Sequence, residues 1–221
     1  MTPPNTKPTS DKPVIVLGAG GHARVLISLL RLINRPVKAV LDDDTSNHHQ
    51  IIDGLSIAGG LDFLTSFEAE SVELVNAIGS AHRPTARQAI YDRYTELGYT
   101  FATLIHPNAV IAPHVKVKTG AQIMASATVQ SGVNLQHNCL INTAAVIDHD
   151  SIIGEHTHIA PGAIICGNVK IGPCCHIGCG ATMIQGISVG RGAVIGAGAT
   201  VINNVCINEI VVGKPARPTP P

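Results

Sequence analysis

His149 is the residue whose type and neighbours are best suited to acid–base chemistry, because it lies between Asp148 and Asp150. An imidazole has an ordinary pKa of about 6.5, so it can remove a proton from a nucleophile at neutral pH. A neighbouring carboxylate can fix the tautomer of the ring and raise its basicity. The spacing predicts a candidate general base at His149, but it does not decide which acid assists. A solvated histidine without a catalytic role is the alternative.

A second group of residues invites a metal-binding interpretation. The segment CCHIGC contains Cys174, Cys175 and Cys179, and the segment HTH contains His156 and His158. Neither has the paired C-x2-C spacing that is typical of structural zinc sites. We therefore expect no metal site.

A repeat of six residues organises the second half of the chain. Every sixth residue from Ile105 to Ile207 is aliphatic, and the residue four places further on is small or slim in most repeats, as from Ala121 to Ala181. Such a repeat is typical of a parallel β-helix, in which each hexapeptide forms one short strand and a corner. Three hexapeptides close one coil, so we expect about six stacked coils around an aliphatic core.

The same repeat places several candidate residues. Cys139 and Cys175 fall in the small inward column, so we expect them to pack in the core. His149 lies outside both inward columns, at a corner. Gly167 stands one coil further along on the same corner, where an unobstructed backbone N–H is suited to stabilise a developing oxyanion.

Strand and helix signals alternate in the first half of the chain. Strands are predicted at 13–18, 36–43, 72–79 and 99–105, and helices at 22–33 and 83–98. In the first helix the helical spacing is carried by Val25, Leu29 and Leu32. This alternation predicts a small parallel, Rossmann-like α/β sheet. The expected parts are thus a disordered leader (1–12), an α/β domain (13–104), a β-helix (105–213) and a C-terminal tail (214–221).

A glycine-rich turn follows the first predicted strand. Gly18, Gly20 and Ala23 satisfy the pattern G-x-G-x-x-A, and Asp42 ends the next strand. Taken alone, this pattern predicts a dinucleotide site, and hence an NAD-dependent oxidoreductase. Against that interpretation, the α/β domain has only about 90 residues and lacks a second mononucleotide-binding half. A tight turn without a ligand is a further alternative.

The composition excludes several classes of partner. Fifteen basic residues balance fifteen acidic ones, unlike the basic surface of a nucleic-acid-binding protein. No segment is long and apolar enough to span a membrane, and the leader lacks the apolar core of a signal peptide. We expect a cytoplasmic protein with no nucleic-acid or membrane partner, in which disulfides are unlikely on compartment grounds. His48 and His49 are expected in a solvated loop.

Five segments together resemble one bacterial family. They are GAGGHARV, VLDDD, AIG, NTAAVIDHDSIIGEHTHIAPGA and VVGKPAR, spread from Pro13 to Arg217. The resemblance is to the sugar acyltransferases with a left-handed β-helix. This family comprises sialic acid O-acetyltransferases and N-acetyltransferases of nucleotide-linked 4-amino sugars. The left-handed sense of the β-helix is implied by this resemblance, since crossover chirality normally runs the other way.

The resemblance also implies roles for individual residues. The acid that assists His149 would be Asp150. Acetyl-CoA would be contacted by His158, Gly167, Cys179 and Ala197. The acceptor pocket would be formed by Gly20, Gly21, His22, Asp42, Asp43 and Gly79, with Asn142 near the sugar. Lys214 and Arg217 would either meet coenzyme A phosphates or belong to a free tail.

The activity implied is acetyl-CoA-dependent N-acetylation of the 4-amino group of a nucleotide-linked deoxysugar, in the synthesis of surface polysaccharide. The nucleotide base is left open. The alternatives are O-acetylation of sialic acid and a non-catalytic scaffold that binds nucleotide sugars. A β-helix of this kind exposes flat walls, so we expect a homotrimer with active sites between neighbouring chains.

Overall fold

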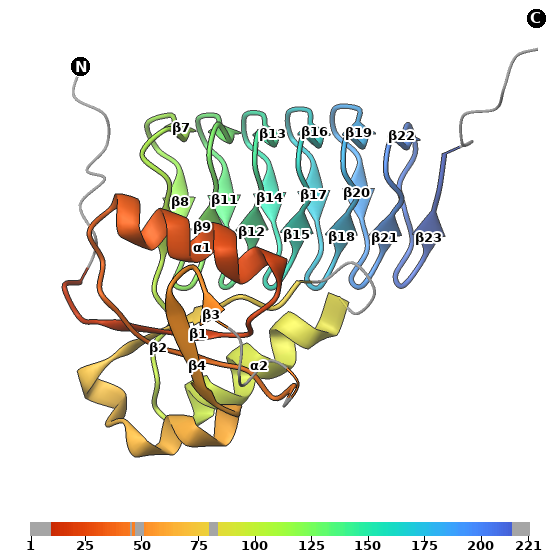
Figure 1. The fold of residues 1–221 in the computed structure, drawn as a ribbon. Helices are drawn as coiled ribbons and strands as arrows, with labels where there is room; N and C mark the ends of the chain where they lie inside the picture. The colour runs from red at the N-terminus through yellow and green to blue at the C-terminus, as the bar shows by residue number, and fades with distance from the viewer. Residues whose placement is uncertain (1–9, 45, 47–50, 80–83, 214–221) are drawn as a thin grey trace, which may run out of the picture.

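The structure of the protein is a computed structural model, which describes residues 10–44, 46, 51–79 and 84–213. The predicted leader up to residue 9, the pair His48 and His49, and the predicted tail with Lys214 and Arg217 lie outside the described residues. An α/β unit packs against the first coils of a long stack of short strands (Figure 1).

The N-terminal unit is built on a five-stranded sheet with the strand order β3-β4-β2-β1-β5. Its strands are β1 (Val14–Leu17), β2 (Val37–Leu41), β3 (Ile51–Ile52), β4 (Leu55–Gly59) and β5 (Glu73–Asn76). Neighbouring strands pair in parallel, except β3 and β4, which form a hairpin. The small parallel sheet is confirmed. The sequence pattern does not predict the hairpin, because β3 is too short to give a periodic signal.

Two helices and two short 3-10 helices cover the sheet. They are α1 (Gly21–Leu32), η2 (Leu61–Ser66), η3 (Ala69–Ser71) and α2 (Pro84–Glu96). The core on one face contains the buried side of α1, and the core on the other contains residues of η2 and α2. The helix expected at 22–33 is present, but two of the residues that carry its helical spacing, Val25 and Leu32, are 46% and 56% exposed. The stripe that packs consists of Ala23, Leu26, Ile27, Leu29 and Leu30.

Of the fourth strand expected at 99–105, only the stretch around Phe101 pairs with the α/β sheet. Phe101 makes a single parallel bridge to Leu74, while Leu104 and Ile105 form the first strand of the β-helix. Ile105 occupies the first inward position of the hexapeptide repeat, so pairing with the next coil competes successfully with extension of the sheet.

The second half of the chain forms two-residue strands that stack in parallel into three walls. Wall 1 consists of β6 (Leu104–Ile105), β9 (Gln122–Ile123), β12 (Leu140–Ile141), β15 (His158–Ile159), β18 (His176–Ile177), β21 (Val194–Ile195) and β23 (Ile210–Val211). Wall 2 consists of β7 (Val110–Ile111), β10 (Thr128–Val129), β13 (Val146–Ile147), β16 (Ile164–Ile165), β19 (Thr182–Met183) and β22 (Thr200–Val201). Wall 3 consists of β8 (Lys116–Val117), β11 (Asn134–Leu135), β14 (Ile152–Ile153), β17 (Lys170–Ile171) and β20 (Ser188–Val189).

Three corners connect these walls in every coil. Corner A leads from wall 1 to wall 2, as at 142–145; corner B leads from wall 2 to wall 3, as at 148–151; and corner C leads from wall 3 to wall 1, as at 154–157. Paired residues in successive coils, such as Val129 and Ile147, are separated by one full turn of three hexapeptides. The predicted parallel β-helix is confirmed.

The core of the β-helix is the predicted pair of columns. Aliphatic residues of the first column from Ile123 to Val201 are buried, and so are the small residues of the second, including Cys139 and Cys175. The prediction for Ile207 is wrong, because this side chain is 68% exposed. Val205 forms a β-bridge with Val189, and Val211 pairs with Ile195. The last coil is therefore two residues shorter than the others, and Val205 and Val211 take the inward positions.

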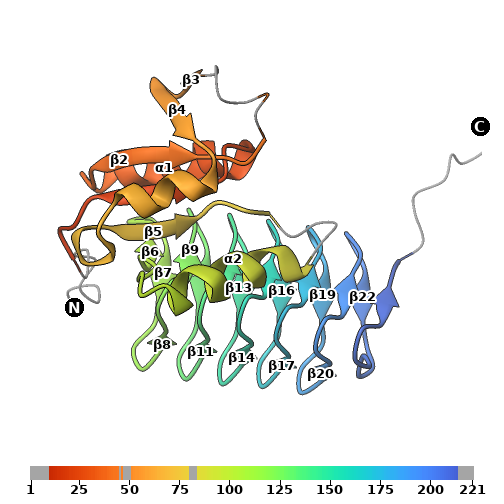
Figure 2. The same ribbon diagram turned by 90° about the horizontal axis from the view of Figure 1, so that it is seen from below.

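The α/β unit sits on wall 1. The first four strands of wall 1 have outward residues that are buried beneath the α/β unit: Leu104, Gln122, Leu140 and His158. Helix α2 runs along the β-helix (Figure 2), where Arg87 donates to the carbonyl of Asn138 and Cys174 donates to Gln88 at corner C. Corner B lies opposite wall 1, so the chain's own α/β unit does not cover it.

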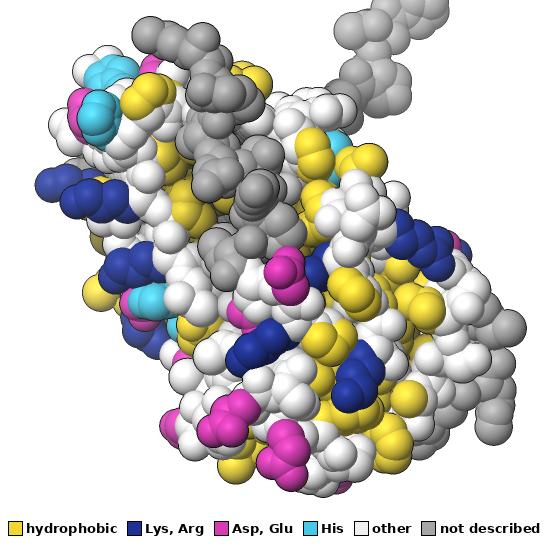
Figure 3. Space-filling view, turned by 90° about the vertical axis from the view of Figure 1, so that its left-hand side faces the viewer, with side chains coloured by type: hydrophobic (Ala, Val, Ile, Leu, Met, Phe, Trp, Pro, Cys, Tyr) yellow, Lys and Arg dark blue, Asp and Glu magenta, His cyan; other side chains and the backbone are white. Residues whose placement is uncertain are grey.

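No helix in the described part of the chain is long and apolar enough to cross a membrane. Seen from the side that is at the left in Figure 1, basic and acidic side chains lie interspersed rather than gathered in one patch (Figure 3). This arrangement fits the equal numbers of acidic and basic residues in the sequence.

Candidate active site

The pair His149 and Asp150 forms the turn at corner B. Asp150 adopts a left-handed conformation with φ 58°, which aspartate tolerates better than most residues. Its Oδ2 lies 3.0 Å from Nδ1 of His149, while Oδ1 of Asp148 accepts the backbone N–H of His149 at 2.7 Å. The hydrogen bond to Asp150 raises the pKa of His149 above its ordinary value. Nδ1 is thereby the donor, and Nε2 has no hydrogen-bond partner among the described residues.

Glycines on the neighbouring coils make room for this pair. A Cβ added at Gly167, on the next coil, would lie 2.6 Å from Cε1 of His149, so the imidazole lies directly over this glycine. A Cβ added at Gly132, on the preceding coil, would lie 3.3 Å from Cγ of Asp150. Only Gly167 is a predicted site residue. The same one-coil spacing, applied backwards from Asp150, would have found Gly132.

His158 lies on wall 1 under the α/β unit and is only 8% exposed. Oδ1 of Asn142 accepts the backbone N–H of Thr143 at 2.8 Å, so the Asn142 amide presents Nδ2 to Nε2 of His158 at 3.1 Å. Nε2 of His158 is therefore an acceptor. Burial, with a smaller effect of the Arg87 charge, lowers the pKa of His158 to about 2. The ring packs edge-to-face on His176, with centroids 5.1 Å apart.

The glycine-rich turn after β1 leaves open space at the start of α1. Gly18 has φ 102°, a conformation that favours glycine. A Cβ there would also lie 2.9 Å from Cδ1 of Ile78. A Cβ at Gly20 or Gly21 would meet nothing within 4 Å. Gly20 is the N-cap of α1 and supplies no side-chain cap, and the first turn contains no acid. A helix start of this kind is favourable for an anion.

A cavity of about 330 Å³ lies beside this turn. It is lined by Gly18, Asp42, Asp43, Leu61, Ile78, Ala86, Ala89 and Ile90. Asp42 accepts the backbone N–H groups of Ala19 and Asp44 at 2.6 and 2.8 Å, and Asp43 accepts that of Leu61 at 2.7 Å. The two carboxylates thus tie three loops together at the rim. Gly79, which follows β5, is exposed, with nothing within 4 Å of an added Cβ.

The remaining predicted acetyl-CoA contacts lie elsewhere. Cys179 and Ala197 are exposed residues of corner A, on successive coils. His149, Asp150 and Gly167 belong to corner B. The residues of the predicted acceptor pocket belong to the α/β unit, His158 lies on wall 1 beneath that unit, and Asn142 begins the neighbouring corner A. Wall 2 separates the two corners within a chain. The structure therefore brings the predicted residues together in two groups rather than one.

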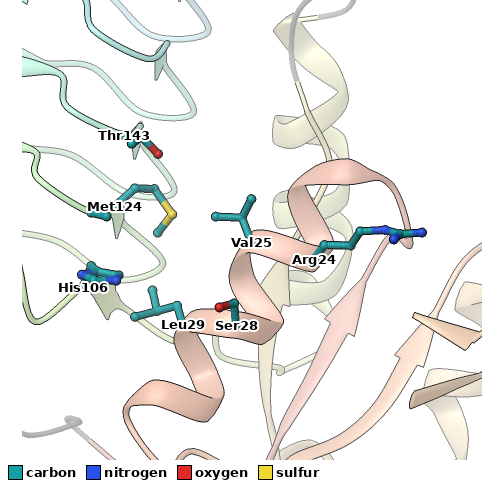
Figure 4. A pocket seen from close by; sticks show the side chains of 8 residues that line it. Arg24, Val25, Ser28, Leu29, His106, Met124 and Thr143 are labelled. Atoms are coloured by element: carbon teal, nitrogen blue, oxygen red, sulfur yellow. The ribbon is translucent and has the colours of Figure 1, made fainter. Parts of the chain in front are cut away.

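A second cavity, of about 400 Å³, lies between α1 and corner A. Val25 and Leu29 point from α1 towards Met124, with His106 and Thr143 beside them (Figure 4). This cavity accounts for the exposure of Val25. It contains none of the predicted site residues.

His156, which the sequence offered as a metal ligand, lies at corner C. Its Nδ1 is 3.0 Å from Nδ2 of Asn138, and its ring packs against Tyr91 of α2. Burial lowers the pKa of His156. Within the described ranges, no group of three or more His, Cys, Asp or Glu residues is placed to share a metal ion.

A glycine-rich α/β unit joined to a hexapeptide β-helix with a corner histidine defines a class of transferases. The family model for the PglD N-terminal domain matches residues 13–94, and that for the bacterial transferase hexapeptide (six repeats) matches residues 150–185. Among curated proteins, the carnitine operon protein CaiE of Shigella dysenteriae is 36% identical over 74 residues. That match spans 29% of this chain and only 37% of CaiE.

Solved structures match over almost the whole chain. The acetyltransferase domain of PglB from Neisseria gonorrhoeae, in complex with acetyl coenzyme A, is 33% identical, with a TM-score of 0.86 over 95% of this chain and 100% of that chain. PerB from Caulobacter crescentus, in complex with CoA and GDP-perosamine, is 30% identical, with a TM-score of 0.84 over 93% and 96%. The chain belongs to the bacterial sugar acyltransferases with a left-handed β-helix.

Proposed function

We propose that this protein transfers the acetyl group of acetyl-CoA to the 4-amino group of a nucleotide-linked amino-deoxysugar, with His149 as the general base. The observation that carries the proposal is the arrangement at corner B. Asp150 holds Nδ1 of His149, so Nε2 is the basic nitrogen, and that nitrogen lies over a glycine instead of a side chain. Such a ring is oriented, accessible and free to accept a proton.

The chemistry requires little else from the protein. As the amine nitrogen attacks the thioester carbonyl, a C–N bond forms and Nε2 of His149 takes the proton from nitrogen. The C–S bond then breaks, and the proton can pass from the imidazolium to the departing thiolate. The N–H of Gly167 has no acceptor among the described residues, so it is a candidate donor to the developing oxyanion.

The acceptor pocket is proposed at the start of α1. The nucleoside fits the cavity at Asp42 and Asp43, and the pyrophosphate fits the uncapped helix start at Gly20 and Gly21. The sugar would then extend over wall 1 towards Asn142. The PerB structure, which holds CoA and GDP-perosamine, supports a nucleotide-linked amino sugar as the acceptor class.

We further propose that the active site is shared between two chains of a homotrimer. The acceptor residues lie in the α/β unit that covers wall 1 and the base lies at corner B, opposite wall 1, so one chain is not expected to bring amine and base together. Wall 2, between corners A and B, presents uncharged outward residues, including Val110 (61% exposed) and Ile164 (43% exposed). A neighbouring chain placed there would bring its corner B to the acceptor of the first chain.

Release of free thiol from acetyl-CoA tests the activity. The protein would be assayed against UDP-, GDP- and dTDP-linked 4-amino sugars and against free sialic acid. We expect turnover with at least one nucleotide-linked amine and none with sialic acid. Turnover with sialic acid alone would instead establish the O-acetyltransferase, and no turnover with any acceptor would favour a non-catalytic scaffold.

The oxidoreductase interpretation finds less support. Among the described strands the α/β sheet contains a single mononucleotide-type unit, whereas a dinucleotide site of this type is built from two. Calorimetry with NAD and with nucleotide sugars separates the two interpretations. Tight NAD binding without nucleotide-sugar binding would overturn the proposal.

A further inference from the structure

A buried cation without a carboxylate partner lies between the α/β unit and wall 1. Arg87 of α2 is fully buried. Nη1 donates to the carbonyls of Ile78 and Asn76 at 2.8 and 3.2 Å, and Nη2 donates to Oδ1 of Asn138 at 3.2 Å. Its Nε has no partner among the described residues. Every group that holds this guanidinium is neutral, so no negative charge among its partners cancels its effect on nearby titratable side chains.

Gln122 extends this network from Arg87 to the acceptor pocket. Gln122 is 1% exposed, and its Nε2 donates to the carbonyl of Asn76 at 2.8 Å. A carbonyl can only accept, so the orientation of the Gln122 amide is fixed. Oε1 therefore faces the other way, towards Nε2 of His22 at 3.0 Å.

The orientation of Gln122 in turn fixes the proton on His22. Oε1 can only accept, so Nε2 of His22 must carry a hydrogen. A second proton, on Nδ1, would place a cation in a mostly buried position near Arg87, and the titratable groups that face this region are Arg87 and His158. Burial and the Arg87 charge lower the pKa of His22 to about 4. Nδ1 has no hydrogen-bond partner among the described residues.

We propose that Arg87 and Gln122 are positioning residues that hold His22 neutral with its proton on Nε2, so that Nδ1 accepts a hydrogen bond from a hydroxyl or amine of the acceptor sugar. The alternative role for a histidine at a helix start is to donate to phosphate. A bare Nδ1 has no hydrogen to donate, and phosphate oxygens have none either. The nucleoside is proposed at Asp42 and Asp43, whereas His22 contacts Gln122 of wall 1, so we assign the donor to the sugar. The sugar assignment rests on the proposed function, whereas the protonation state does not.

The protonation state is read directly by NMR of the wild-type protein with ¹⁵N-labelled histidine. His22→Gln identifies the His22 signals among those of the eleven histidines. We expect Nδ1 of His22 at the chemical shift of an unprotonated nitrogen and Nε2 at that of a protonated one, unchanged from pH 8 to pH 6. Titration of His22 near pH 6.5, or the opposite tautomer, would overturn the proposal whether or not the protein is an acetyltransferase.

Gln122→Glu tests the consequence for binding. A carboxylate at this position favours the charged imidazole and removes the acceptor at Nδ1. Loss of one such hydrogen bond lowers kcat/KM for the amino-sugar nucleotide by about tenfold or more. The Kd values of UDP, GDP or dTDP, which lack the amino sugar, should change less than about twofold. Gln136→Glu, the same change at a partly exposed position of corner C, should leave both quantities unaltered.

An equal loss of affinity for the nucleoside diphosphate without the amino sugar would show that His22 binds the nucleotide part. That result would overturn the assignment of His22 to the sugar. If wild-type protein binds none of the three nucleotides, the proposed function fails, while the NMR result still decides the tautomer. If Gln122→Glu does not fold, the wild-type spectra and His22→Phe, measured with the same ligands, replace it.

Discussion

At the scale of the residue, the account depends on how Asp148, His149 and Asp150 divide their tasks. Asp148 bonds the backbone and Asp150 bonds the ring. Spacing alone left both acids open, because each is one residue away from His149; the turn, in which Asp150 has φ 58°, decides which carboxylate reaches the ring. The family resemblance named Asp150, and the geometry at corner B agrees with it.

Asp150→Asn should lower kcat by about tenfold and shift the acidic limb of the pH profile. Because Asp150 raises the pKa of His149, its removal lowers that pKa, so the base remains deprotonated to lower pH. The limb of kcat/KM should therefore move to lower pH in the variant. Asp148→Asn is the matched control and should move the limb less. A limb that stays in place for Asp150→Asn, or moves to higher pH, contradicts the assignment.

Gly167→Ala should separate activity from stability. The added methyl group meets the His149 ring, which can swing away, so the fold should be kept while the base is displaced. A displacement of about 1 Å can cost about a hundredfold in kcat. Gly154→Ala is the control, because its methyl group would lie 2.5 Å from the backbone nitrogen of Pro173. We expect a lower Tm for Gly154→Ala and a nearly unchanged Tm for Gly167→Ala. Full activity of Gly167→Ala would place the base elsewhere.

At the scale of the element, the repeat predicted most of the β-helix and little of the contact between the two units. Ile123, Ile147 and Ile195 followed from counting in sixes, since each coil repeats the same packing. The repeat of six does not hold in the shortened last coil, where Val205 and not Ile207 is buried. Arg87 and Gln122 gave no sequence signal, because their partners come from α2, β5 and wall 1, which meet only when the α/β unit docks.

That contact should make stability depend on pH. His22 and His158 have pKa values of about 4 and about 2 in the folded chain, below the ordinary 6.5 that applies when unfolded. The unfolded chain therefore binds protons first, and the free energy of unfolding falls as the pH drops below 6.5. Each histidine contributes at most about 1.4 kcal/mol per pH unit.

Urea unfolding at pH 7 and pH 5.5, at one protein concentration, measures this dependence. His158→Gln should reduce the loss of stability between the two pH values, since one titrating group is gone. The same pH dependence in wild type and variant would mean that His158 is not held neutral by burial.

At the scale of the whole molecule, the two groups of site residues on opposite sides of one β-helix are the reason for the proposal that neighbouring chains complete the site. This arrangement can be tested by mixing two inactive variants. His149→Ala removes the base, and Gly20→Phe fills the open space at the start of α1. In trimers assembled from equal amounts of both, about a quarter of the sites should combine an intact base with an intact pocket.

Activity should therefore reappear in the mixture, with light scattering reporting a trimer. A site contained within one chain would give no restoration, because no chain carries both intact groups. A monomer with full activity would contradict the shared site as well.

The most direct test of the central claim is the kcat of His149→Ala at neutral pH, measured beside His158→Ala. Removal of a general base costs about 10²–10⁴-fold, so His149→Ala should lose that much, with both KM values nearly unchanged and some rate recovered at high pH. Nε2 of His158 already accepts a hydrogen bond from Asn142, so His158→Ala should act mainly through KM. Wild-type kcat in His149→Ala, with loss of kcat in His158→Ala, would contradict the assignment of the base.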